Sequence, residues 1–235
     1  AIDTLPDDIL CSIFHLILQT HGPFSLFDKN NAPVIFTHVC RRWRALAFDT
    51  PLLWTNVCLE NLHPSYAAER PASNALRKAE MVAKREAIRT WLARSKDCPL
   101  AVFLHASPPK ESTSTIRGET QFQQDTVDLL HSSVARWKMV QIRLDDSSSI
   151  AHYSPLLSHA PDDYQLLEAL AINLKSQDDS SNGFPLRIAD LSILGAPSLR
   201  RITIETPWDN VLASPIAWST LTHLSIGSYA RGRAI

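Results

Sequence analysis

Glycine is scarce in this chain of 235 residues, which contains six glycines against fifteen prolines. None of the glycines lies in a phosphate-binding loop or in a Gly-x-Ser-x-Gly nucleophile elbow. The sequence also lacks the His-Glu-x-x-His and Cys-x-x-Cys patterns of zinc and redox sites. These absences argue against an enzyme built on a familiar motif. We therefore expect no catalytic residue, no cofactor and no metal ion.

Cysteines, long apolar runs and net charge are also limited. The four cysteines, Cys11, Cys40, Cys58 and Cys98, are far apart, which is typical of reduced thiols in a cytosolic or nuclear protein. No apolar run approaches the roughly 18 residues that cross a membrane, so no membrane partner is expected. A formal net charge of −1 gives no overall basic excess for nucleic acid. The length suits one small module and one larger domain.

Residues 5–18 carry more apolar surface than an ordinary surface helix needs. Pro6 suits a first helical turn, and Asp7 and Asp8 suit the positive end of a helix. Two apolar stripes follow, one of Ile9, Ile13 and Leu16, and one of Leu10, Phe14, Ile17 and Leu18. A helix that is apolar over most of its circumference is buried on more than one side. One interpretation is that both stripes lie in the protein's own core. A small helical unit, however, rarely builds enough core unaided. We therefore favour a partner protein that covers one of the two stripes.

A second helix is predicted over residues 33–48, and Thr50-Pro51 ends it. One face of this helix is apolar and contains Phe36, Val39, Cys40, Trp43 and Ala47. Arg41, Arg42 and Arg44 flank that face. Arginines beside a tryptophan are also typical of nucleic-acid binding. Because Trp43 falls on the apolar stripe, we favour a core tryptophan with a solvated basic rim.

The order of these motifs resembles an F-box. Leu5-Pro6 and the first helix are followed by Val39-Cys40-Arg41-Arg42-Trp43 and then by Leu53-Trp54. The resemblance covers residues 3–58 and implies a three-helix module that docks on the Skp adaptor of a Skp–cullin–F-box ubiquitin ligase. It places these residues at the adaptor: Leu5, Pro6, Ile9, Leu10, Ile13, Phe14, Val39, Cys40 and Trp43. Trp54 is expected to pack the F-box onto whatever follows it.

The spacing departs from the usual F-box, because the stretch between Phe14 and Val39 is longer by about ten residues. The extra length falls in a loop rich in turn formers, and long surface insertions add little closure entropy. This departure leaves open which residues of the middle helix touch the adaptor. Together with Thr50-Pro51-Leu52-Leu53-Trp54, the pattern looks most like the large F-box families of mushroom-forming fungi.

After the F-box-like segment, an apolar triplet with spacing i, i+3, i+5 recurs along the chain. The triplets are Trp54-Val57-Leu59, Trp137-Val140-Ile142, Leu167-Leu170-Ile172, Leu199-Ile202-Ile204 and Leu221-Leu224-Ile226, with residues 99–104 as a less regular strand candidate. The pattern looks like a degenerate leucine-rich repeat, in which helix, turn and strand units stack. Successive third positions are 45, 38, 30, 32 and 22 residues apart, and regular leucine-rich repeats span roughly 20–29. The alternative is an ordinary α/β domain whose parallel strands share a buried pattern.

We therefore expect a mainly α, three-helix F-box at residues 1–52 and an irregular α/β leucine-rich-repeat-like solenoid at residues 53–235. The first strand is predicted at about 54–59, an inserted basic helix at about 66–96, and a mobile polar loop at about 107–120. The basic helix has an apolar side containing Leu76, Ile88, Trp91 and Leu92. Its basic excess suits an acidic partner or, as we favour, a solvated face. No polar capping repeat follows the last strand, so the solenoid is expected to be truncated.

These expectations favour a substrate-recognition adaptor of a Skp–cullin–F-box ubiquitin ligase, with no chemistry of its own. The F-box would bind the Skp adaptor and through it a cullin, and the repeats would bind a protein substrate that the sequence does not identify. A ligase-independent F-box scaffold is the first alternative. A nucleic-acid-binding protein that uses residues 41–44, and an enzyme with a site assembled from scattered His, Asp and Cys side chains, are less favoured.

Overall fold

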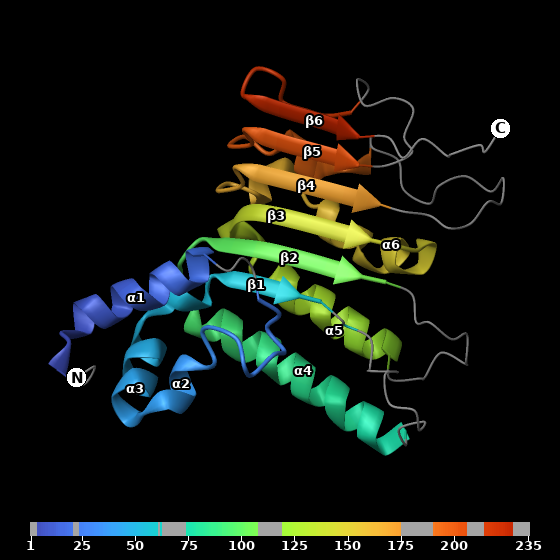
Figure 1. Cartoon of the computed structure of the whole chain (residues 1–235). Coiled ribbons are helices and arrows are strands. Elements are labelled where there is room, and N and C mark those ends of the chain that lie inside the picture. The colour runs from blue at the N-terminus through green and yellow to red at the C-terminus, as the bar shows by residue number, and fades with distance from the viewer. Residues whose placement is uncertain are drawn as a thin grey trace, which may run out of the picture.

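A helical N-terminal region is followed by an α/β region with a six-stranded parallel sheet (Figure 1). The computed structural model describes residues 4–20, 24–60, 62, 74–107, 119–174, 190–205 and 214–227. The N-terminal region contains α1 (Asp7–Thr20), α2 (Phe36–Val39), α3 (Arg41–Asp49) and the 3-10 helix η2 (Pro51–Trp54). No helix among the described residues is long and apolar enough to cross a membrane.

The three helices of the N-terminal region meet at a small aromatic core. The rings of Phe14 from α1 and Phe36 from α2 stack with centroids 4.3 Å apart. Trp43 from α3 packs edge-on against Phe14 at 4.9 Å. Leu10 and Leu18 of α1 are buried on the same side of the helix as Phe14. One of the two predicted stripes of α1 therefore fills the protein's own core.

The predicted single helix over residues 33–48 is broken at Cys40. This residue is extended, with φ −155° and ψ 173°, and its sulfur accepts a hydrogen bond from the backbone N–H of Trp43 at 3.5 Å. Cys40 thus caps α3 instead of continuing α2. Because the break rotates one helix relative to the other, the five apolar residues do not share one face. Phe36 and Ala47 are buried, whereas Val39 and Cys40 are exposed.

The sheet orders its strands as they occur in the chain, β1-β2-β3-β4-β5-β6, and every neighbouring pair is parallel. The strands are β1 (Asn56–Leu59), β2 (Leu100–Ala106), β3 (Trp137–Leu144), β4 (Ala169–Leu174), β5 (Arg201–Glu205) and β6 (His223–Gly227). Their predicted apolar positions pair in two continuous rows. One row is Val57, Val102, Val140, Leu170, Ile202 and Leu224, and the other is Leu59, Leu104, Ile142, Ile172, Ile204 and Ile226.

Both rows lie on the same face of the sheet, and their side chains are buried along most of it. Helices cover this face, behind the strands in Figure 1. Those helices are α4 (Asn74–Arg94), α5 (Glu119–His131) and α6 (Ser147–Tyr153), with the 3-10 helices η3 (Val134–Arg136), η4 (Ser154–Leu157), η5 (Pro161–Asp163) and η7 (Ser192–Gly195) in the connections. Only in β6, at the edge of the sheet, are the row residues exposed, at 41% for Leu224 and 52% for Ile226. Burial of the apolar rows against helices forms the main core.

The inserted basic segment forms α4, of which residues 74–94 are described and residues 66–73 lie outside the described residues. Ile88 and Trp91 are buried and Leu92 is half-buried, as their predicted apolar side requires. Leu76 was assigned to the wrong side, because it is 61% exposed. At about 100° per residue, Leu76 lies roughly 120° around the helix from Ile88, whereas Met81 lies within about 20° and is buried. Of the predicted polar loop, residues 108–118 lie outside the described residues, and residues 119–120 begin α5.

Candidate functional site

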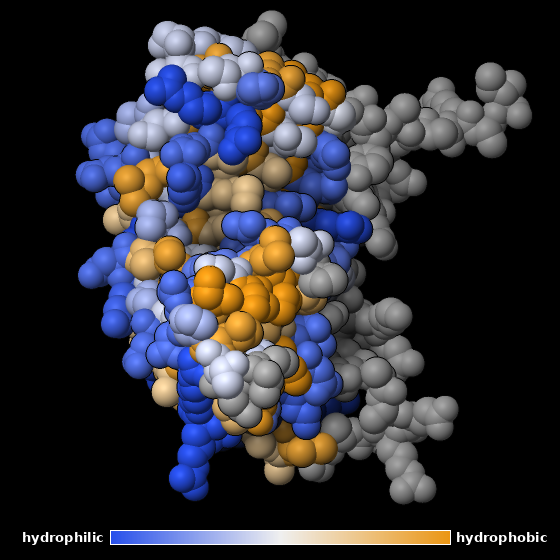
Figure 2. Space-filling view, turned by 60° about the vertical axis from the view of Figure 1, so that its left-hand side comes forward, coloured by the Kyte–Doolittle hydropathy of each residue, from blue (hydrophilic) through white to orange (hydrophobic). Residues whose placement is uncertain are grey.

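The second stripe of α1 is open on the surface of the molecule. Ile9, Ile13 and Leu16 are exposed at 44%, 37% and 59%. Figure 2 shows apolar side chains gathered over this part of the protein. The stripe stands on a rigid base, because the opposite side of the same helix is locked in the aromatic core. An exposed apolar row of this kind is a candidate interaction surface.

Further apolar side chains are exposed on the segment from α2 to η2. They are Ile35, Val39, Phe48 and Leu52, each at least 38% exposed. Val39 was predicted at the adaptor, but Ile35, Phe48 and Leu52 were not, and Leu16 was placed in a stripe without a role. The residues that the sequence analysis missed do not lie on one helical face, because the chain turns at Cys40 and again at Pro51. A periodicity argument that assumes one continuous helix does not find them.

An ion pair fixes the start of α1 relative to α3. Nε of Arg42 lies 2.9 Å from a carboxylate oxygen of Asp7, and Arg42 also donates to the backbone oxygen of Leu5. Arg44 donates from Nε to the backbone oxygen of Thr37 at 2.7 Å. Two of the three clustered arginines therefore hold the helical region together. This use of their donors weakens the alternative of a phosphate-binding basic patch.

The predicted adaptor-facing residues fall into two groups. Pro6, Ile9, Ile13, Val39 and Cys40 are exposed, and Leu5 and Trp43 are half-buried. Leu10 and Phe14, in contrast, are fully buried in the protein's own core. Leu10 and Phe14 therefore support this surface from inside, and their contact with the adaptor stays a prediction. The resemblance to the F-box did not separate these two groups, because it placed residues from both stripes of α1 at the adaptor.

Trp54 joins the helical region to the sheet region, as predicted. Its indole N–H donates to the backbone oxygen of Ala47 at 2.8 Å, and its ring packs edge-on against Trp91 of α4 at 4.9 Å. The guanidinium of Arg94 lies over two rings, 4.1 Å from the centroid of Phe48 and 4.5 Å from that of Trp54. Burial lowers the pKa of Arg94. The joint is thus an aromatic cluster with a cation packed into it.

The open face of the sheet presents mainly small and polar side chains, with Phe103 and Met139 among them. Its register places His105, Arg143, Asn173 and Glu205 in one row across β2 to β5. Within that row, Nδ2 of Asn173 donates to a carboxylate oxygen of Glu205 at 2.6 Å. Arg143 donates from Nε to Asp145 at 3.1 Å. The row is a band of partly exposed polar groups whose geometry is fixed by these bonds.

A Ser–His–Asp group lies at the end of this row, at the carboxyl ends of β2 and β3. Nε2 of His105 is 3.1 Å from Oδ2 of Asp145 and 3.1 Å from Oγ of Ser107. Burial alone would raise the pKa of Asp145, but hydrogen bonds from His105 and Arg143 outweigh it and hold that pKa below its ordinary value. A catalytic triad needs the carboxylate at Nδ1 and the nucleophile at Nε2. Here both lie at Nε2, so the arrangement does not fit a triad.

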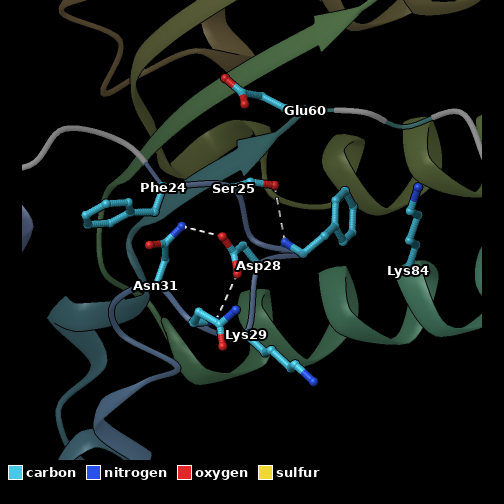
Figure 3. Close-up of a pocket in the computed structure, with 9 residues that line it drawn as sticks. Phe24, Ser25, Asp28, Lys29, Asn31, Glu60 and Lys84 are labelled. Carbon is cyan, nitrogen blue, oxygen red and sulfur yellow. Dashed lines mark hydrogen bonds between the residues drawn. The ribbon is translucent and has the colours of Figure 1, made fainter. Parts of the chain in front are cut away.

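A polar hollow of about 690 Å³ lies beside the loop at residues 24–31 (Figure 3). Asp28 accepts hydrogen bonds from the backbone N–H of Asn30 at 2.9 Å and from the side chain of Asn31 at 2.7 Å. Glu60, which follows β1, and Lys84 of α4 also line the hollow. The carboxylate of Asp28 is thus used within the loop itself. Among the described residues, no three His, Cys, Asp or Glu side chains are grouped to hold a metal ion.

The scattered histidines and cysteines of the helical region do not converge on one centre within the part of the chain that the structure describes. His15 is half-buried and His38 is exposed, and His21 lies outside the described residues. The four cysteines are free thiols, of which Cys58 is buried, Cys11 and Cys98 are half-buried, and Cys40 is exposed. Burial raises the pKa of the Cys58 thiol to about 12, with a smaller contribution from Glu60.

Comparison with known proteins finds a family match for the helical region and the first strand, and none for the rest of the sheet region. Residues 2–60 match the family model described as F-box-like. This match covers α1, α2, α3, η2 and β1. No curated protein and no solved structure is significantly similar to the chain.

Proposed function

We propose that this protein is a substrate-recognition adaptor of a Skp–cullin–F-box ubiquitin ligase. The observation that carries the proposal is the open stripe of Ile9, Ile13 and Leu16, on a helix whose other side fills the core of an F-box-like domain. The stripe and the exposed side chains from Ile35 to Leu52 form the surface that a Skp adaptor would cover. Through that adaptor the protein would reach a cullin.

The apolar stripe would contribute part of the binding energy of such a contact. Full burial of one aliphatic side chain contributes about 1.5–3 kcal/mol. Ile9, Ile13 and Leu16 already lose part of this exposure in the free protein, so each would contribute less. The exposed side chains of Val39 and Leu52 would add to the contact. The sum must exceed the loss of translational and rotational freedom, which explains why several residues are needed.

We assign the open face of the sheet to binding of a protein substrate. In this proposal the strands stack as in leucine-rich repeats and form one continuous binding surface. Phe103, Met139 and Thr203 lie on this face among small side chains such as Ala169 and Ala171, next to the polar row. Small side chains leave room for a partner, and the fixed polar groups select among partners. The protein would catalyse nothing itself. It would raise the rate of ubiquitin transfer by holding the substrate near the ligase.

Substitution of the open stripe tests the adaptor contact. Ile9→Asp and Ile13→Asp are expected to weaken binding of a purified Skp adaptor at least tenfold, because each buries a carboxylate in an apolar contact. Gln19→Asp is the matched control, because it adds the same charge to an exposed position on the polar side of α1. Circular dichroism checks that all three variants fold. Undiminished binding by both isoleucine variants would rule out this surface.

Reconstitution with a cullin separates the ligase from a scaffold. If the protein, the Skp adaptor and a cullin form one complex, and that complex transfers ubiquitin to a protein captured by the sheet, the ligase is supported. A stable complex with the adaptor that excludes the cullin would instead favour the ligase-independent scaffold.

A further inference from the structure

A second hollow lies between the loop at residues 24–34 and α4. Its volume is about 560 Å³, which is within the roughly 300–1,000 Å³ of small-molecule sites. The apolar part of its wall includes Leu26, Val34, Trp54, Ala87 and Trp91. The loop is anchored, because the backbone N–H of Leu26 donates to the backbone oxygen of Cys58 at 3.0 Å. The hollow therefore has fixed walls from three parts of the chain.

The charged side chains of this wall are unevenly paired. A carboxylate oxygen of Glu80 forms an ion pair with Nζ of Lys84 at 2.9 Å. Glu86 forms an ion pair with Arg89, which does not line the hollow. Both acidic residues of the wall are thus engaged. Lys29 and Arg94 also line the hollow, and no described carboxylate lies within ion-pair distance of either. The described wall therefore has two cations without an anionic partner.

Arg94 is the more constrained of these two cations. Its guanidinium packs over the rings of Phe48 and Trp54, which stabilise the charge through their faces. Aromatic faces do not replace the in-plane acceptors that a guanidinium fork normally uses. Burial lowers the pKa of Arg94, as expected for a cation that is partly withdrawn from water and has no carboxylate of the described residues beside it. A planar carboxylate would supply two in-plane acceptors and the opposite charge.

We propose that this hollow binds a small amphipathic carboxylate. The aryl or alkyl body of the ligand would lie against Leu26, Ala87 and the indole of Trp91, and its carboxylate would pair with Arg94. Lys29 adds a second positive charge to the lining of the same hollow. The proposal concerns a different surface from the open stripe of α1, and it does not depend on the ligase. Because the site includes Trp54 at the joint, its occupancy would stabilise the contact between the helical region and α4.

Three probes of matched shape test the charge requirement on the full chain. 4-Phenylbutyrate, 4-phenylbutan-1-ol and 4-phenylbutylamine share one hydrocarbon body and differ at the head group. Titration calorimetry is expected to show saturable binding of the carboxylate, at least tenfold tighter than the alcohol, and no saturable binding of the amine. Equal affinity for the carboxylate and the alcohol would overturn the proposal. So would an absence of carboxylate binding at a ligand concentration ten times the dissociation constant of roughly 1 mM that is typical of so small a ligand.

Two variants locate the binding. Arg94→Gln is expected to weaken carboxylate binding at least tenfold and to leave the alcohol unchanged. Ala87→Leu fills the hollow without removing a charge and should weaken both ligands. Lys78→Gln is the control, because it removes one positive charge from an exposed position of α4 outside the hollow. Thermal unfolding shows whether Arg94→Gln folds, and Ala87→Leu tests the site independently of it. Binding that survives Ala87→Leu would place the ligand elsewhere and refute the site.

Discussion

α1 and the strands of the sheet contain the same aliphatic residue types and bury them differently. Ile142 and Ile172 are both 1% exposed, whereas Ile9 and Ile13 of α1 are 44% and 37% exposed. The strands from β1 to β5 place their apolar rows against helices, so these rows are covered, and only β6 at the edge of the sheet leaves its row residues exposed. α1 has a core on one side and, among the described residues, no covering element on the other. An open stripe adds little to folding, so its contribution appears only when a partner buries it.

The covered side of α1 should dominate the stability of the helical region. We expect Phe14→Ala to reduce the free energy of unfolding by about 3–5 kcal/mol, because it leaves a cavity beside Phe36 and Trp43. Urea denaturation followed by tryptophan fluorescence measures this loss. A reduction below about 1 kcal/mol would mean that the aromatic core contributes little, and the contrast between the two sides of α1 would fail.

The joint between the two regions should be the next most sensitive position. Trp54→Phe keeps an aromatic ring but removes the donor to the backbone oxygen of Ala47. We expect a loss of about 1–3 kcal/mol in the free energy of unfolding, because a buried carbonyl loses its partner. Trp218→Phe, at a position that is 44% exposed, is the control and should change stability little. Equal effects of the two substitutions would contradict the role of the joint.

One chemical change made at two places tests the comparison directly. Ile142→Val in the covered row is expected to cost about 0.5–1.5 kcal/mol, because it removes a buried methylene. Ile13→Val on the open stripe should stay within about 0.5 kcal/mol. Both values come from urea denaturation under the same conditions. If Ile13→Val costs as much as Ile142→Val, the stripe is already covered by part of the chain itself.

Acid should affect the sheet region through Asp145. Its pKa is held below the ordinary value, so the folded state favours the carboxylate and gains stability above the unfolded-state pKa of about 3.9. That gain is lost as pH falls through the lower, folded-state pKa. Asp145→Asn should therefore flatten the fall in stability between about pH 5 and pH 3, measured by urea denaturation at each pH. Asp49→Asn, at an exposed position of α3, is the control for removing one carboxylate. An unchanged pH profile for Asp145→Asn would contradict this assignment.

The spacing of apolar residues in the sequence predicted the helices and strands better than it predicted which apolar side chains are buried. The triplets fall on or just before strands, because a parallel strand buried on one face requires spaced apolar residues at fixed positions. Both stripes of α1 were visible, but only the fold shows that Leu10 and Phe14 lie inside. The break at Cys40 was missed, because a sulfur that caps a helix leaves no apolar signature. Arg94 was counted as part of a basic helix, and its position over two rings depends on a tryptophan 40 residues earlier.

The strand order has a consequence for how this chain can change. Each strand pairs only with the strands that precede and follow it, although the connections between them differ greatly in length. Pairing between sequence neighbours means that each pairing closes one connection only, although every parallel pairing is non-local and therefore slow to form. Lengthening a connection adds little closure entropy and does not alter which strands are adjacent. Insertions can therefore accumulate between strands while the order of the sheet persists, so the exposed loops and the sheet face can diversify independently.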